Sequence, residues 1–108
     1  MKKLEMSWNQ LWPLVNILNE VCHGIKIDIQ SKIGFSYEEV YALLKKITIY
    51  EVNAYEADIK KENIFRDEEV LILKRCLHEV AMEIDEWEFQ TRIGITIQEA
   101  NIIKEKMT

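Results

Sequence analysis

The chain has 108 residues, the size of one ordinary domain, and 48% of them are hydrophobic while 31% are charged. That balance excludes an intrinsically disordered chain, and the length excludes a protein that must rely on a metal or a disulfide to fold. The formal net charge of −5 argues against a nucleic-acid-binding protein, because the phosphates would repel it.

The first residues do not form a predicted export signal. Met1, Lys2 and Lys3 look like the start of one, but the segment behind them is interrupted by polar side chains: Glu5, Asn9, Gln10, Asn16, Asn19 and Glu20. No apolar run approaches the length of about 18 residues that a membrane span needs. With only two cysteines, we expect a cytoplasmic protein with free thiols and no membrane association.

The chain contains an internal repeat. Residues 14–47 align with residues 73–107 when one extra residue, Glu86, is allowed in the second copy. The alignment has identical residues at these pairs: Leu14/Leu73, Leu18/Leu77, Glu20/Glu79, Val21/Val80, Ile25/Ile84, Gln30/Gln90, Ile33/Ile93, Gly34/Gly94, Glu39/Glu99 and Lys46/Lys106. We interpret this as the duplication of one helical unit, in which each copy buries its apolar face against the other.

The first unit, about residues 7–47, reads as helix, short element, helix. Its opening helix carries an apolar stripe at spacings of three and four: Leu11, Leu14, Val15, Leu18, Val21 and Cys22. Ser7 with Gln10 resembles a capping box, but Pro13 points to a later start, around Leu11 or Trp12. The closing helix follows Gly34, with Ser36 and Glu39 as a second capping box.

The segment from Thr48 to Arg66 has no counterpart in the alignment. Residues 47–50 have some strand character, but Tyr50 to Lys61 also fits a partly buried helix, and we predict a helix there.

The second unit, about residues 66–107, repeats the first. Asp67 is the predicted cap of its opening helix, whose apolar stripe is Val70, Leu73, Leu77, Val80 and Ile84. The closing helix follows Gly94 and begins with the capping box of Thr96 and Glu99. The sequence therefore predicts an all-α single domain over residues 1–108, a small bundle of two helix–short element–helix repeats.

No catalytic or metal-binding constellation is complete. Cys22 and Cys76 fall on apolar stripes, where a cysteine is usually a small buried hydrophobe. Glu20 with His23 has the spacing of a di-iron motif, but its second copy is missing. Cys22, His23, Cys76 and His78 lack the short spacings of a zinc site. We expect no enzyme activity, no metal and no cofactor.

The glycine-turn segments raise one alternative. Residues 92–99, and 32–39 before them, have the look of a helix-turn-helix, so a DNA-binding regulator or a phage or plasmid accessory protein stays open. The helix from Thr96 to Met107 is nearly balanced in charge, however, and offers few cations for phosphates.

The acidic residues are concentrated in the second half. Residues 1–52 hold six basic and six acidic side chains, whereas residues 53–108 hold eight and thirteen. Within that half, one ten-residue stretch has no Lys or Arg, and its candidate partner-binding residues are Glu79, Met82, Glu83, Asp85, Glu86, Trp87 and Glu88. On a continuing helix, Glu79, Glu83 and Glu86 would line one face. The alternative is a solvated acidic face with Trp87 in the core.

Four further aromatic residues lie at helical spacing. Trp8, Trp12, Tyr37 and Tyr41 fit a core, with a second binding surface as the alternative.

In size, acidity and lack of a catalytic constellation, the chain resembles the small immunity proteins that bacteria make against their own delivered toxins, such as those of contact-dependent growth-inhibition systems. Proteins of this kind have many unrelated folds, so the resemblance assigns no site residue. It implies a cytoplasmic inhibitor that occludes the active site of a basic toxin domain, and such toxins are often nucleases. From the charge distribution we expect segment 79–88 to make the contact, in a monomer or a homodimer.

Overall fold

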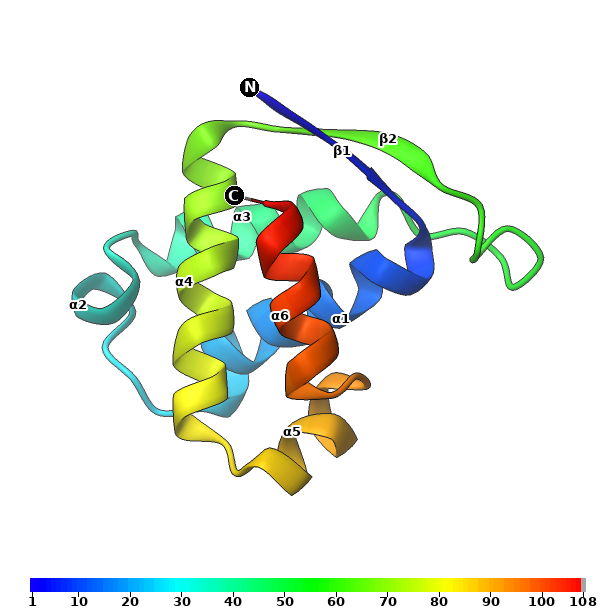
Figure 1. Ribbon diagram of the computed structural model, residues 1–108. Coiled ribbons are helices and arrows are strands. Elements are labelled where there is room, and N and C mark those ends of the chain that lie inside the picture. The colour runs from blue at the N-terminus through cyan, green and yellow to red at the C-terminus, as the bar shows by residue number, and fades with distance from the viewer. Residues whose placement is uncertain (108) are drawn as a thin grey trace.

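The helical periodicity of the sequence is realised in a fold that also contains a small sheet. The computed structural model describes residues 1–107 and is mostly helical, with 64% of the chain in helices (Figure 1). The elements in chain order are β1 (Lys2–Met6), α1 (Trp8–Asn19), the π-helical segment η1 (Glu20–Gly24), α2 (Ile29–Ile33), α3 (Tyr37–Thr48), β2 (Lys61–Phe65), α4 (Asp67–Glu83), α5 (Glu86–Ile93) and α6 (Ile97–Lys106). Within the described chain, no helix combines the length and the apolarity that crossing a bilayer requires.

The two strands correct the prediction of an all-α fold. β1 and β2 pair antiparallel, with Leu4 opposite Asn63, and each strand turns alternate side chains toward the core. A strand of five residues obtains its hydrogen bonds from a partner about 60 positions away, so the local pattern alone gives little sign of it. β2 begins at Lys61, the last residue of the segment predicted as a helix, and continues beyond it to Phe65.

The loop between α3 and β2 also contradicts the predicted helix over residues 50–61. The side chain of Asn53 accepts hydrogen bonds from the backbone N–H groups of Tyr55 (3.0 Å) and Glu56 (3.2 Å), which competes with helix formation. The Asn9 backbone N–H then donates to the Ala57 carbonyl at 3.0 Å. These bonds hold the loop beside the start of α1.

The helix starts agree with the capping residues, with two corrections. α1 begins at Trp8 with Ser7 as N-cap, so the predicted later start is wrong, and Pro13 is accommodated inside the helix. The cap of α4 is Arg66, one residue before the predicted Asp67. In both cases the side chain three residues after the cap accepts from the cap N–H, and that contact sets the start.

The two halves of the chain have a similar order of elements, although the π-helical segment η1 has no counterpart after α4. Each has a strand, a long helix, a short helix, a left-handed glycine (Gly34, φ 83°, and Gly94, φ 98°) and a closing helix. Ser36 and Thr96 cap the closing helices through the predicted capping boxes with Glu39 and Glu99. In Figure 1, α4 and α6 run antiparallel in front, and α1 and α3 do so behind.

The halves also contact each other in matching ways. The short helix α2 packs against α4, and α5 packs against α1. The Asn16 side chain donates to the Ile93 carbonyl at 2.8 Å, and Arg75, which aligns with Asn16, donates to the Ile33 carbonyl at 2.8 Å. Each first helix therefore caps the C-terminus of the other half's short helix. The core lies between the helix pairs and includes fully buried Leu14, Leu73, Cys76, Phe65 and Phe89.

One buried carboxylate ties α3 to α4. Glu69 accepts from the Lys46 ammonium at 2.6 Å and from the Arg66 backbone N–H at 2.8 Å. Burial opposes ionisation of Glu69, but these hydrogen bonds and the charges of Lys46 and Arg66 outweigh it and hold its pKa below the ordinary value.

Candidate partner-binding site

The acidic segment folds as a corner rather than as one helix. α4 ends at Glu83, Ile84 adopts an extended conformation with its side chain in the core, and Asp85 precedes α5. The predicted face on a continuing helix is therefore wrong for Glu86, whereas Glu79 and Glu83 lie one turn apart on α4. The break lies next to Glu86, the residue that has no counterpart when residues 73–107 are aligned with residues 14–47.

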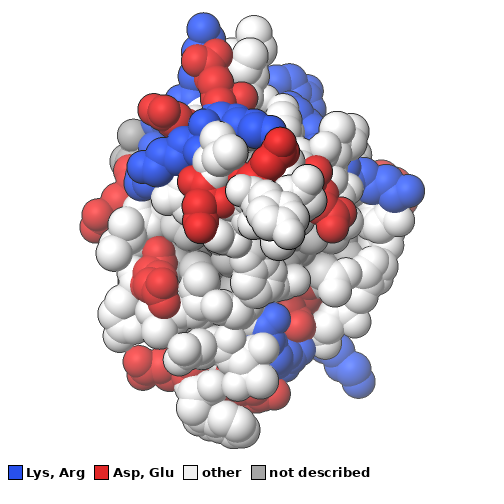
Figure 2. Space-filling view, turned by 90° about the vertical axis from the view of Figure 1, so that its right-hand side faces the viewer, with Lys and Arg blue, Asp and Glu red and all other residues white. Residues whose placement is uncertain are grey.

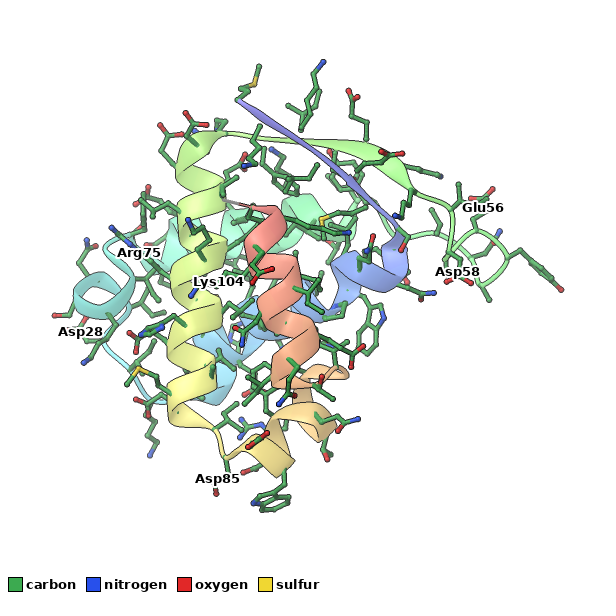
Figure 3. All side chains as sticks on the ribbon, viewed as in Figure 1. Asp28, Glu56, Asp58, Arg75, Asp85 and Lys104 are labelled. Carbon is green, nitrogen blue, oxygen red and sulfur yellow. The ribbon has the colours of Figure 1, made fainter. Side chains whose placement is uncertain are left out.

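The turn exposes apolar side chains among carboxylates. Met82 is 70% exposed and Trp87 is 74% exposed, so the expectation of Trp87 in the core is wrong. Glu83, Asp85 and Glu86 are exposed beside them, and Figure 3 shows Asp85 at the tip of the turn between α4 and α5. Within residues 1–107 none of the three carboxylates has a cationic partner. We call this set, Met82, Glu83, Asp85, Glu86 and Trp87, the acidic corner.

The other two residues predicted for this site, Glu79 and Glu88, have contacts outside the corner. Glu88 accepts from Arg92 at 3.4 Å, and Arg92 also binds Glu20 on the π-helical segment. The hydrogen bond from Arg92 to Glu20, together with the negative charges of Glu20 and Glu88, raises the pKa of Arg92. Glu79 faces a different groove, described below. The predicted segment therefore contributes to the corner, to the ion pair with Arg92 and to the wall of a separate groove.

A shallow groove extends from the acidic corner to the start of α6. It has a volume of about 360 Å³, with Trp87 on one wall and Ile97 on the other, and the Gln98 amide donates to Glu86 at 3.5 Å. The corner thus offers an exposed indole, a hollow beside it and unpaired negative charge.

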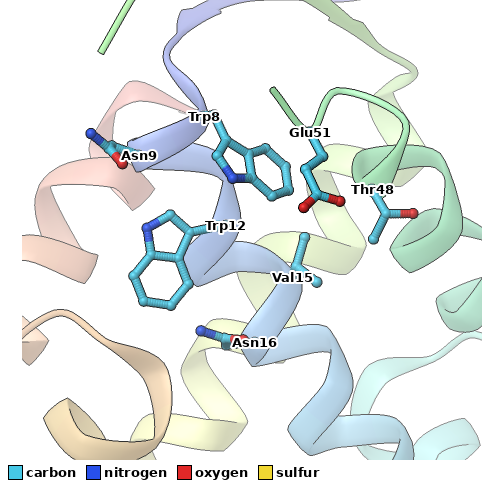
Figure 4. A pocket seen from close by; sticks show the side chains of 7 residues that line it. All are labelled: Trp8, Asn9, Trp12, Val15, Asn16, Thr48 and Glu51. Atoms are coloured by element: carbon cyan, nitrogen blue, oxygen red, sulfur yellow. The ribbon is translucent and has the colours of Figure 1, made fainter. Parts of the chain in front are cut away.

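A second groove carries the other two tryptophans. Trp8 and Trp12 lie one turn apart on α1 and are half-buried, beside Glu51 from the loop after α3 (Figure 4). We call this hollow of about 400 Å³ the Trp groove; it is lined by Trp8, Asn9, Trp12, Val15, Asn16, Thr48 and Glu51. The sequence placed these indoles at helical spacing, but it gave no sign that a loop from residue 49 onward would form the opposite wall.

A third groove, in the second half, is basic. It lies along α4 between α2 and α6, with a volume of about 290 Å³, and we call it the basic groove; Arg75 and Lys104 are labelled on two of its sides in Figure 3. Its lining residues are Lys32, Leu71, Lys74, Arg75, His78, Glu79 and Lys104. The charges of the molecule are therefore more segregated than the net value suggests. On the side drawn in Figure 2, by contrast, both signs are mixed in the upper part and a broad uncharged area crosses the middle.

The remaining candidate residues include the two cysteine thiols. Burial raises the pKa of the Cys76 thiol to about 12, with added contributions from Cys22 and Glu79, and burial also raises the pKa of Cys22. Both thiols are therefore held protonated. In the described part of the chain, no three His, Cys, Asp or Glu side chains are placed to hold a metal ion.

The tyrosine pair lies on the surface of α3. Tyr37 and Tyr41 stack at 5.8 Å, and His23 contacts both rings edge-on at about 6 Å. This cluster packs the π-helical segment against α3, and Tyr37 remains 39% exposed.

Comparison of the chain with protein-family models, with curated proteins and with solved structures finds no match.

Proposed function

We propose that the protein is a protein-binding inhibitor, of the kind represented by bacterial immunity proteins, that docks on a basic toxin domain and occludes its active site. The observation that carries the proposal is the acidic corner, where Trp87 is 74% exposed among carboxylates that have no cationic partner in the described chain. An exposed indole costs solubility unless a partner covers it, and aromatic side chains are frequent anchors in interfaces. Unpaired carboxylates around it would speed encounter with a basic surface and set the register.

The same proposal includes the origin of the fold. Two units of one helical design, about residues 7–47 and 66–107, would have arisen by duplication. The matching element order, the two left-handed glycines and the aligned cross-half hydrogen bonds of Asn16 and Arg75 support it. The strands extend the match, because Leu4 and Asn63 align and also lie opposite each other.

A cytoplasmic site of action completes the proposal. It is supported by the two free thiols, Cys22 and Cys76, which suit a reducing compartment. The inhibitor would act there as a monomer or a homodimer.

The first test is a capture experiment with tagged protein and lysate of the native host, eluted with increasing salt. We expect one basic protein to elute, and its activity to be inhibited by the purified chain. The double variant Glu83→Lys/Glu86→Lys should weaken that complex at least tenfold and flatten its salt dependence. Trp87→Ala should weaken it by a similar factor without changing the salt dependence.

The matched control is Glu5→Lys/Glu105→Lys, two exposed sites far from the corner in sequence with the same change in net charge. If this control weakens the complex as much as the corner variant does, the corner is not the binding site. The helix-turn-helix alternative is tested in parallel by a gel shift with random DNA at low salt. Retention of DNA by the purified chain would favour a regulator and overturn the inhibitor proposal.

A further inference from the structure

The Trp groove holds its aromatic walls in fixed positions. The Trp12 ring lies against Gly94, so close to the glycine Cα that no side chain would fit there, and Asn16 is tied to the Ile93 carbonyl one turn further on. On the opposite wall, the Glu51 backbone N–H donates to the Thr48 carbonyl at 3.1 Å. A preorganised groove loses little entropy when a ligand enters.

The fold does not require tryptophan at these positions. In the second half, Asp67 aligns with Trp8 and Leu71 aligns with Trp12, and the aligned helix α4 forms with these residues. The Asp67 side chain is 85% exposed. The two indoles are therefore not needed to build this kind of helix, and their joint placement around a hollow calls for another explanation.

The polar side chains around the groove select for a cation. Glu51 is the one charged residue among those that line the groove, and Figure 4 shows its side chain next to the Trp8 indole in the view drawn. A second carboxylate, that of Asp58, accepts a hydrogen bond from the side-chain amide of Asn9, which lines the groove. Neither lysine nor arginine lines this groove, in contrast to the basic groove. Indole faces attract cations, and a carboxylate at the same site adds to that attraction.

We propose that the Trp groove binds an arginine side chain of a protein partner, with the guanidinium stacked on the indoles and paired with Glu51. Arginine fits better than lysine, because its planar group is weakly hydrated and stacks on aromatic faces. The groove volume of about 400 Å³ accommodates the guanidinium and its methylene stem. This proposal does not rest on the acidic corner, since the two surfaces carry different tryptophans.

The three tryptophans allow a direct test by NMR of the indole N–H groups. The full chain is titrated with N-acetyl-arginine amide, and the three resonances are assigned with single Trp→Phe variants. We expect the resonances of Trp8 and Trp12 to shift with millimolar affinity, while Trp87 stays unchanged. N-acetyl-citrulline amide, the neutral analogue, should bind about tenfold more weakly, because it lacks the charge.

Glu51→Gln tests the counter-ion without disturbing the core, because residue 51 is exposed. It should weaken arginine binding about two- to fivefold, whereas Glu105→Gln, with the same loss of charge elsewhere, should not. Equal binding of citrulline, equal loss in both variants, or no shift of Trp8 and Trp12 would each overturn the proposal. Shifts that depend on protein concentration alone would assign the groove to a second copy instead, and would also overturn it. A shift confined to Trp87 would overturn the proposal for the groove while leaving the acidic corner in place.

Discussion

The Trp groove and the basic groove occupy related places in the two halves, and they differ almost completely in chemistry. Trp12 and Val15 of the first groove align with Leu71 and Lys74 of the second. At the next aligned pair, Asn16 and Arg75 make the same bond to a short-helix carbonyl. The backbone frame thus fixes where a hollow forms, and the side chains around it decide what the hollow can bind. The aligned helix positions therefore carry an aromatic surface with an acidic rim in one half and a cationic surface in the other.

The largest expected effect tests whether the scaffold is shared. Leu14→Ala and Leu73→Ala remove aligned side chains that are both fully buried. Each should lower the free energy of unfolding by about 3 kcal/mol, through lost burial and the cavity left behind. Equilibrium unfolding in urea measures this, with Leu71→Ala, which is 38% exposed, as the mild control. A cost below about 1 kcal/mol for one of the pair would mean that the halves are not packed alike.

The next largest effect concerns the ion pair between Glu69 and Lys46. Glu69 aligns with Gln10, and both side chains accept from the N–H of the helix cap, so Glu69→Gln keeps the cap and loses the ion pair with Lys46. At neutral pH the variant should be less stable by about 1–2 kcal/mol.

The contribution of the Glu69–Lys46 ion pair to stability depends on pH. Because the pKa of Glu69 is lowered in the folded protein, its stabilisation is present above the ordinary carboxyl pKa and is lost as the pH falls through the lowered value. The difference in unfolding free energy between the wild type and Glu69→Gln should therefore shrink in acid. A difference that does not change with pH would contradict the ion pair as its source.

A smaller effect tests the contact between the halves. Asn16→Ala and Arg75→Ala should each cost about 1 kcal/mol, because each leaves one carbonyl at a short-helix end without its donor. Hydrogen exchange should localise the loss: the Gly94 amide should lose protection in Asn16→Ala, and the Gly34 amide in Arg75→Ala. Exchange that accelerates uniformly would instead indicate that these bonds support the whole fold.

The smallest effect separates binding from folding. Trp87→Ala should change the free energy of unfolding by less than about 0.5 kcal/mol, since the side chain is 74% exposed. Trp12→Ala should cost several times more, because that ring packs against Gly94. Thermal unfolding of the two variants compares them directly. A large loss of stability in Trp87→Ala would give this indole a structural role and weaken the case for the acidic corner.

Much of the helical part of the fold could be predicted from residues close in sequence. Gly34 and Gly94 marked the breaks before the closing helices, and Ser36 and Thr96 marked their starts, because caps and turns depend on contacts within three or four residues. The candidate site was predicted less well. The acidic stretch was found, but its division at Ile84 was not, and neither were the ion pair of Glu88 with Arg92 and the place of Glu79 in a separate groove.

The sequence by itself determined the size of the domain, its helical character, the placement of both closing helices and the acidity of one segment, since each depends on composition or on local periodicity. Only the tertiary structure decided the pairing of β1 with β2, the exposure of Met82 and Trp87, and the walls of the three grooves. The physical reason is the same in each case. Strand pairing, burial and concavity depend on which distant segments meet, and a residue such as Glu51 joins Trp8 only when the chain has folded back on itself.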